Sequence, residues 1–365
     1  MIATRRFAAL ALGLLLPLGA HPASAEPPVS CAGGLGRAVA PARVRRDAAG
    51  GAFFEYVMDG ATITSAEAPP GLDLTTAPAE TLERYGLPPR PDGEGLAEWT
   101  AAMRAYRSTA NDPDHALCVG NGTGRTRRSA SETQCSEAPQ NCTNWAGRSA
   151  RLGGYTGVAA NVTVPSMPLS GNCASEGHTS TWVGIGTEAG ASGVLQAGTV
   201  SRLFPGVAIN TYAFYEWVNS YGAGTSPILS AWNAAPGHQM YERVSVNTSS
   251  RGVNFYVEDV TTGQHLTSTV GGIYGYYDGD SAGWIVENHT LVEESNIKTS
   301  PWNWTNALVT RYSTTTYGGS TQNTEVLVGV EKGSWPANDN EIIEAPGAWS
   351  STTAFPTSWY ACRGT

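Results

Sequence analysis

Residues 243–260 read RVSVNTSSRGVNFYVEDV, and this stretch decides the expected fold. Polar and apolar residues alternate from Arg243 to Val246 and again from Val253 to Val260. A period of two is typical of β-strands whose two faces meet different surroundings. Ser249-Ser250-Arg251-Gly252 lies between the two runs and has the composition of a turn. The stretch therefore predicts a β-hairpin.

Short runs of the same kind recur from Asn144 onward, separated by Gly, Ser, Asn and Pro. They predict further strands at Tyr155–Val164, Thr179–Ile185, Ala208–Val218, Trp284–Asn288, Ala307–Tyr312 and Val326–Val330. No helical pattern competes with them, and we find no internal repeat. Residues 144–365 are therefore expected to form one all-β domain, a sandwich or a barrel.

The preceding residues, 26–143, have a different composition. Ten of the eleven tryptophans lie beyond this segment, which contains only Trp99. Helical spacing appears in Ala77–Tyr85 and Glu94–Arg107. The polar stretch Gly120–Asn144, which holds Arg125, Arg127 and Arg128, is typical of an exposed, cleavable linker. We interpret residues 26–143 as a partly helical prosegment with its linker; the alternative is a retained accessory domain.

The N-terminus has the pattern of a secretory signal. Arg5 and Arg6 precede the apolar run Phe7–Leu16, and Ala23-Ser24-Ala25 is a small-residue cleavage site. Pro17 interrupts the run, which is short for a membrane anchor. We therefore predict a signal peptide over residues 1–25 and a secreted, extracellular protein. The six cysteines on an exported chain favour disulfides, but their spacing does not fix the pairing.

Charge and composition exclude some partners. The formal net charge is −9, the pI is near 5.2, and only two lysines are present. Without a basic patch, a nucleic-acid partner is not expected. The apolar content of 41% does not suit a polytopic membrane protein, so no membrane association is expected after signal removal. A monomer is expected.

Several familiar catalytic patterns fail on inspection. Gly279-Asp280-Ser281-Ala282-Gly283 fits G-x-S-x-G and is similar to the nucleophile loop of trypsin-like serine peptidases. A serine nucleophile needs a His base in its own sequence context, which the chain lacks, so a tight turn before a strand is the better interpretation. Neither H-E-x-x-H nor an Asp-Thr/Ser-Gly pair is present. No metal site and no cofactor are predicted.

Polar residues also stand inside apolar strands, in five short blocks. These are Asn144-Trp145-Ala146-Gly147, Trp182-Val183-Gly184-Ile185, Leu195-Gln196-Ala197-Gly198, Tyr215-Glu216-Trp217 and Trp284-Ile285-Val286-Glu287. Taken singly, each polar residue is explained by strand alternation. Taken together, the five blocks resemble the glutamic peptidases, or eqolisins, in order and rough spacing. Residues 82–91 also look like the N-terminal region of bacterial members.

The resemblance implies a fold, an activity and a site. The fold is an all-β, lectin-like (concanavalin-like) sandwich of two curved antiparallel sheets, and the activity is acid endopeptidase cleavage of protein or peptide substrates. The matching catalytic positions are Gln196 and Glu287. Glu287 would activate water and Gln196 would stabilise the oxyanion, with no metal and no acyl-enzyme.

Two further residues are candidates for substrate binding, and two depart from the family pattern. We interpret Trp182 as groove lining, with a core role as the alternative, and Glu216 as either a partner of the catalytic amide or a structural carboxylate. Fungal members carry Asp where this chain has Gly186 and Val200. For Gln196 and Glu287 to line one groove, we expect their strands to be neighbours in a concave sheet.

Two other functions remain open from the sequence. A carbohydrate-active sandwich would use Glu216 and Glu287 as an acid and base pair. A glycan-binding module without turnover is the third hypothesis. The carbohydrate-active hypothesis leaves Gln196 without a role, and the presence of both Gln196 and Glu287 argues against the non-catalytic module.

Overall fold

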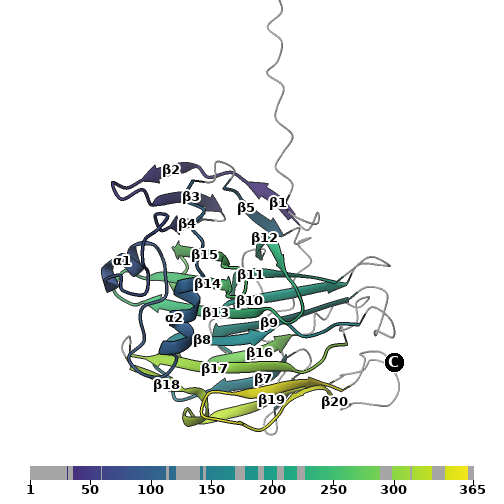
Figure 1. Cartoon of the computed structure of the whole chain (residues 1–365). Helices are drawn as coiled ribbons and strands as arrows, with labels where there is room; N and C mark the ends of the chain where they lie inside the picture. Colours follow the sequence, from purple (N-terminus) through teal and green to yellow (C-terminus); the bar gives the residue numbers. More distant parts are fainter. Residues whose placement is uncertain are drawn as a thin grey trace, which may run out of the picture.

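The computed structural model describes residues 31, 36–58, 60–111, 115–120, 140–142, 145–168, 177–187, 193–203, 209–219, 227–287, 298–312, 315–330 and 342–360. In these residues two antiparallel sheets pack face to face, which confirms the expected all-β sandwich (Figure 1). The predicted signal peptide, most of the linker and Cys135, Cys173 and Cys362 lie outside the described residues.

The first sheet carries the proposed site. In spatial order it consists of β12 (Ile228–Ala234), β11 (Ile209–Asn219), β10 (Gly193–Leu203), β9 (Gly177–Ile185), β16 (Ala282–Glu287), β7 (Trp145–Ala150), β19 (Thr324–Val330) and β20 (Ile342–Pro346). All of these pairings are antiparallel, and the short β6 (Gln140–Cys142) joins β19 in parallel. The middle of this sheet is therefore β10, β9 and β16.

The second sheet lies against the first. Its strands, in spatial order, are β15 (Gln264–Gly271), β14 (Gly252–Asp259), β13 (Gln239–Asn247), β8 (Tyr155–Thr163), β17 (Trp302–Arg311) and, beside β17, β18 (Thr315–Gly318) and β21 (Phe355–Trp359). β21 pairs with both β17 and β20, so it joins the two sheets along one side. Short 3-10 helices follow at Tyr274–Tyr276 and Gly319–Thr321.

Alternating side chains from the two sheets fill the space between them. Val183, Leu195 and Tyr215 of the first sheet belong to the same buried cluster as Val244 and Phe255 of the second. The rings of Tyr215 and Phe255 stack with their centroids 4.9 Å apart. Large aromatic side chains supply much of the apolar area that this core buries.

The N-terminal segment adds strands to both sheets. These are β1 (Gly36–Val39), β2 (Arg43–Arg46), β3 (Ala52–Met58), β4 (Ala61–Glu67) and β5 (Leu117–Gly120). β5 pairs with β12 and with β1, whereas β4 pairs with β15 and with β3, which in turn pairs with β2. The helices α1 (Ala79–Arg84) and α2 (Leu96–Ala105) confirm both predicted helical patches.

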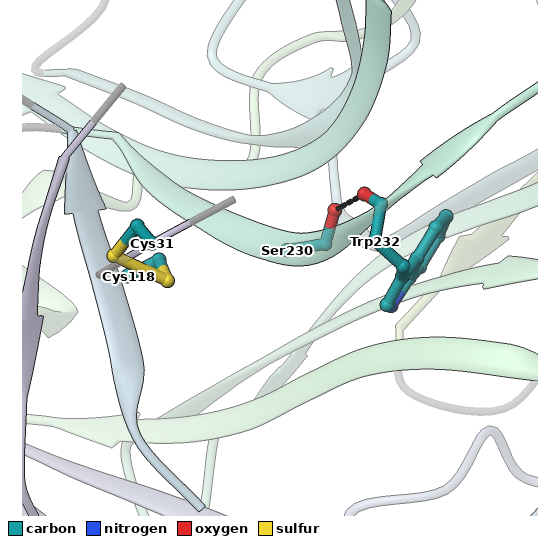
Figure 2. The surroundings of a disulfide bond; sticks show 4 residues. All are labelled: Cys31, Cys118, Ser230 and Trp232. Carbon is teal, nitrogen blue, oxygen red and sulfur yellow. Dashed lines mark hydrogen bonds between the residues drawn. A yellow bond between two sulfur atoms is a disulfide. The ribbon is translucent and has the colours of Figure 1, made fainter. Parts of the chain in front are cut away.

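A disulfide between Cys31 and Cys118 lies within this segment. Figure 2 shows it near β12, where the Ser230 hydroxyl donates to the Trp232 carbonyl oxygen over 2.7 Å. The pairing of β12 with β11 shifts in register at this place, so the hydroxyl closes a local irregularity of the strand. The disulfide agrees with the prediction that the cysteines of an exported chain pair.

Most predicted strands are confirmed, including the hairpin. β13 and β14 pair from Met240–Asp259 down to Asn247–Gly252, and Arg251 adopts a positive φ of 57° in the turn. The strands of the N-terminal segment were not predicted. No helix among the described residues is long and apolar enough to cross a membrane.

Candidate active site

The four proposed site residues lie on one face of the first sheet. They come from four consecutive strands in the order β11, β10, β9 and β16. Their sequence neighbours Val183, Leu195, Ala197, Tyr215, Trp217, Trp284 and Val286 belong to the core between the sheets. Because side chains alternate along a strand, Trp182, Gln196, Glu216 and Glu287 face the opposite way. They therefore share the outer face of the sheet.

Trp182 and Glu287 form one hydrogen-bonded pair. The indole Nε1 of Trp182 donates to Oε2 of Glu287 over 2.9 Å. Trp145, which lies opposite Glu287 on β7, meets the Trp182 ring edge-on with the centroids 5.1 Å apart. Trp182 is fully buried, whereas Glu287 is half-buried. The two rings thus fix the orientation of a carboxylate that solvent still reaches.

Gln196 and Glu216 form the second pair. They lie directly opposite each other on β10 and β11, and Nε2 of Gln196 donates to Oε1 of Glu216. Glu216 is fully buried, and Gln196 is 4% exposed. A side-chain NH₂ group has two hydrogens, so the bond to Glu216 orients the amide and uses one of them.

β9 lies between the strands that carry Gln196 and Glu287. Glu287 lies opposite Ser180 of β9, whereas Gln196 lies opposite Gly184 of the same strand. The expectation that the strands of Gln196 and Glu287 are neighbours is therefore wrong. In a flat sheet, two strand spacings across and four residues along the strands place the Cα atoms of Gln196 and Glu287 roughly 16 Å apart. Trp182, on β9, lies between the two proposed catalytic groups.

Glycines make room for the ring and the backbone of Trp182. A Cβ added at Gly184 would lie 2.9 Å from the Cζ3 atom of Trp182, and one at Gly198 would lie 2.5 Å from the Trp182 Cα atom. A larger residue at either position would displace the tryptophan from its place beside the backbone. The signal for this was present in the sequence as the Gly of W-V-G-I and of L-Q-A-G, but sequence reasoning did not use it.

The structure shows what surrounds Gly186 and Val200, the two residues that depart from the family pattern. Gly186 has a φ of 89°, and a Cβ there would lie 1.9 Å from the Gly193 carbonyl oxygen. An Asp at this position would be strained, so the local backbone explains its absence. Val200 lies opposite Ser180, which itself lies opposite Glu287 on the far side of β9. The apolar side chain of Val200 therefore lies in the same row across the strands as Ser180 and Glu287.

A polar layer lies beneath the site, on the core side of the sheet. The hydroxyls of Thr181 and Thr199 are 2.8 Å apart and join β9 to β10. Glu242 of β13 is fully buried between the sheets. Burial raises the pKa of Glu242 well above its ordinary value, and the nearby Thr181 hydroxyl lowers it by a smaller amount. Burial thus favours the neutral form of Glu242, which lies below the strands of the proposed site and which sequence reasoning missed.

The serine motif forms a turn, as predicted. Gly279 has a φ of 70°, and β16 begins at Ala282. Ser281 is fully buried, and its carbonyl oxygen accepts a hydrogen bond from the Gly186 amide over 3.0 Å. Within the described part of the chain, no group of three or more His, Cys, Asp or Glu side chains is placed to hold a metal ion.

Comparison with known protein families decides the relationship. Residues 143–334, more than half of the chain, match the model of the peptidase A4 family. The chain belongs to the peptidase A4 family. This confirms the predicted relationship to the glutamic peptidases. All four proposed site residues of this A4 family member lie inside the matched range.

Aspergillopepsin-2 of Aspergillus niger is 31% identical to this A4 family member over an alignment of 163 residues, and the match covers 40% of this chain and 55% of that protein. The chain thus spans about half the length of the curated relative it matches. Among solved structures, scytalido-glutamic peptidase with a transition state analog inhibitor is similar, with 20% identity, a TM-score of 0.47 and coverage of 60% of this chain and 98% of that one. Aspergilloglutamic peptidase of Aspergillus niger has 22% identity, a TM-score of 0.38 and coverage of 50% and 99%.

Proposed function

We propose that this A4 family member is a secreted endopeptidase that cleaves proteins or peptides at acid pH. The observation that carries the proposal is the placement of two preoriented pairs, Glu287 with Trp182 and Gln196 with Glu216, on one face of the family-matched sheet. One pair presents a carboxylate and the other an amide donor. These are the groups that water attack on an amide carbonyl requires.

The proposed reaction uses a water molecule held between the two pairs. Glu287, as a carboxylate, accepts a proton from the water while its oxygen attacks the scissile carbonyl carbon. The second N–H of Gln196 donates to the developing oxyanion. Glu287 then returns the proton to the leaving amine, and the tetrahedral intermediate breaks down to acid and amine. A neutral amide keeps its donor at any pH, which suits work in acid.

The hydrogen bonds favour positioning roles for the other two residues. Trp182 and Glu216 are fully buried and each contacts a catalytic group. This supports Trp182 as the residue that orients Glu287, in place of the groove-lining role expected from the sequence. It likewise supports Glu216 as the partner of the Gln196 amide. A buried Glu216 engaged with Gln196 is a poor partner for Glu287 in a glycosidase acid and base pair.

Cleavage of casein or denatured haemoglobin by the purified matured protein tests the proposal. Cleavage is measured across acid pH with a pepsin-type inhibitor and a chelator present. We expect activity to survive both agents and to fall at least about 100-fold in Glu287→Gln, because the general base is lost. The exposed Glu80→Gln serves as the control. Full activity in Glu287→Gln would overturn the catalytic assignment, and glycan hydrolysis without proteolysis would favour the carbohydrate-active alternative.

A further inference from the structure

The N-terminal segment is part of both sheets. On the first sheet, Cys118 and Val119 of β5 lie opposite Leu229 and Ile228 of β12. On the second, Ile63 and Thr64 of β4 lie opposite Val270 and Thr269 of β15. Figure 1 shows these N-terminal strands continuing the two sheets at the same side of the sandwich. Without the segment, β12 and β15 would be open sheet edges.

The segment also fills one end of the main core. Phe54, Tyr56 and Ile63 are buried in the same cluster as Tyr215 and Phe255 of the sandwich. The Ser65 hydroxyl donates to the Thr267 carbonyl oxygen over 2.9 Å, in a buried place. The core therefore has no boundary near residue 143, where the family match begins.

The helices of the segment cover the outer face of the second sheet. Trp99 and Met103 of α2 pack in one buried cluster with Tyr241 of β13 and Tyr256 of β14. The Asn254 side-chain amide of β14 donates to the Gly86 carbonyl oxygen over 2.7 Å. Polar and apolar contacts thus both join the segment to this face.

A buried ion pair adds a further link. Nε2 of His265, on β15, lies 3.1 Å from both carboxylate oxygens of Glu67, on β4, and the two side chains are 2% and 4% exposed. His115 lies 3.6 Å from Oε1 of Glu67, and the Tyr106 hydroxyl donates to Oε2 over 2.9 Å. Burial would raise the pKa of Glu67, but His265 and His115 hold it well below its ordinary value. Burial lowers the pKa of His265, and Glu67 more than compensates, so the net shift is upward. The pair therefore stays charged in acid.

We propose that β1 to β5 and the two helices are not discarded on maturation but remain as a permanent, non-covalently bound part of the protein. Cutting the chain after Gly120 would then give a two-part molecule. The segment would be the partner that completes the edges of both sheets by adding strands to them. It would also cover the outer face of the second sheet. The proposal replaces the expected loss of residues 26–143, and it does not rest on the catalytic assignment.

The disulfide pairing allows the association of the two parts to be tested without a covalent link between them. Cys31 and Cys118 are the only cysteines before residue 135, and they are bonded to each other. A cut between residues 121 and 134 therefore leaves no disulfide between the two parts. A recognition sequence for a specific protease is inserted there in the full chain, the chain is cut, and the product is run on size exclusion at pH 4.5. We expect both fragments in one peak at the position of the uncut protein, with the thermal midpoint within about 5 °C of the uncut value.

Two variants examine the basis of the association. In Glu67→Gln the buried pair is lost, so we expect the fragments to separate at a lower urea concentration than in the unchanged sequence. Glu55→Gln breaks only an exposed pair with Arg45 inside the segment, and we expect no change. Separation of the fragments in buffer, with the larger fragment still folded by near-ultraviolet circular dichroism, would overturn the proposal. This readout needs no activity, so it is independent of the proposed function.

Discussion

Buried neighbours of Gln196 and Glu287, the proposed catalytic residues, set the geometry of the site. Trp182 and Glu216 have no surface to offer a substrate, yet each forms a hydrogen bond to a group that would take part in the reaction. Their contribution should therefore appear in the rate of the chemical step rather than in substrate binding.

Trp182→Phe keeps an aromatic ring but removes the indole N–H. We expect kcat to fall about 10- to 100-fold with KM little changed, because Glu287 loses the donor that orients it. Steady-state kinetics on a peptide substrate measures this split. Trp232→Phe is the matched control, since its indole donates to the His265 carbonyl oxygen over 3.3 Å, away from the site. A rise in KM at constant kcat would instead indicate the groove-lining role.

Glu216→Gln keeps the size of the side chain and replaces one carboxyl oxygen by an NH₂ group, which cannot accept a hydrogen bond. The bond from the Gln196 amide is then less well defined, which allows the amide to rotate. We expect kcat to fall about tenfold, again with KM little changed. Glu325→Gln, which breaks an ion pair with Arg151 near the surface, is expected to leave both constants unaltered. Equal effects of the two substitutions would contradict a positioning role for Glu216.

At the scale of elements, alternation in the sequence predicted most strands of the sandwich and the face on which the site residues lie. It could not predict the two pairs, because they depend on how β10 is aligned with β11 and how β9 is aligned with β16. Nothing in the local pattern of Leu195-Gln196-Ala197-Gly198 specifies that Glu216 lies opposite Gln196. A shift of pairing by two residues would preserve the faces and separate the partners.

The strands of the N-terminal segment were missed for a related reason. β2 has the sequence Arg43-Val44-Arg45-Arg46, and all four residues are exposed, so no alternation marks it. β1 and β5 have only four residues each. Short edge strands are stabilised by the strands they join, and the partners of β5 and β4 in the two sheets lie more than 100 residues further along the chain.

The turn between β9 and β10 requires glycine at residue 186. Gly186 and Gly237 have nearly the same positive φ, 89° and 88°, but a Cβ at Gly186 would meet the Gly193 carbonyl oxygen whereas one at Gly237 would meet nothing within 4 Å. Gly237→Ala should cost about 1 kcal/mol of unfolding free energy, from backbone strain alone. Gly186→Ala should cost clearly more, by about 2 kcal/mol or above. Urea unfolding compares them, and equal losses would show that crowding at Gly186 relaxes freely.

At the scale of the molecule, the raised pKa values of two buried carboxyls, Glu258 and Glu242, favour a fold that is more stable in mild acid than at pH 8. Burial raises the pKa of Glu258 to about 8, against smaller opposing effects of Tyr256 and His265. The folded protein then holds a proton that the unfolded chain releases near its ordinary pKa of 4.5. Unfolding free energy therefore falls as pH rises from about 4.5 to 8. The raised pKa values of Glu242 and His265 likewise make the unfolding free energy fall as pH rises.

Urea unfolding at pH 5 and pH 8 measures this dependence. The protein should lose unfolding free energy on the order of a few kcal/mol between the two values. Glu258→Gln cannot ionise, so its loss over the same interval should be smaller. Glu80→Gln, on the exposed side of α1, should follow the unchanged protein. If Glu258→Gln shows the full loss, the carboxyl at this position does not set the pH dependence.

The pairing of β4 with β15 also has a consequence for the order in which the chain folds. Ser65 meets Thr267, and Glu67 meets His265, about 200 residues later in the sequence. A ribosome makes β4 and β5 first, and their partners in the two sheets, β15 and β12, are synthesised only later. Such distant pairings close large loops, so they form slowly. The N-terminal segment is thus the first part of the protein to be made and among the last to acquire its native structure.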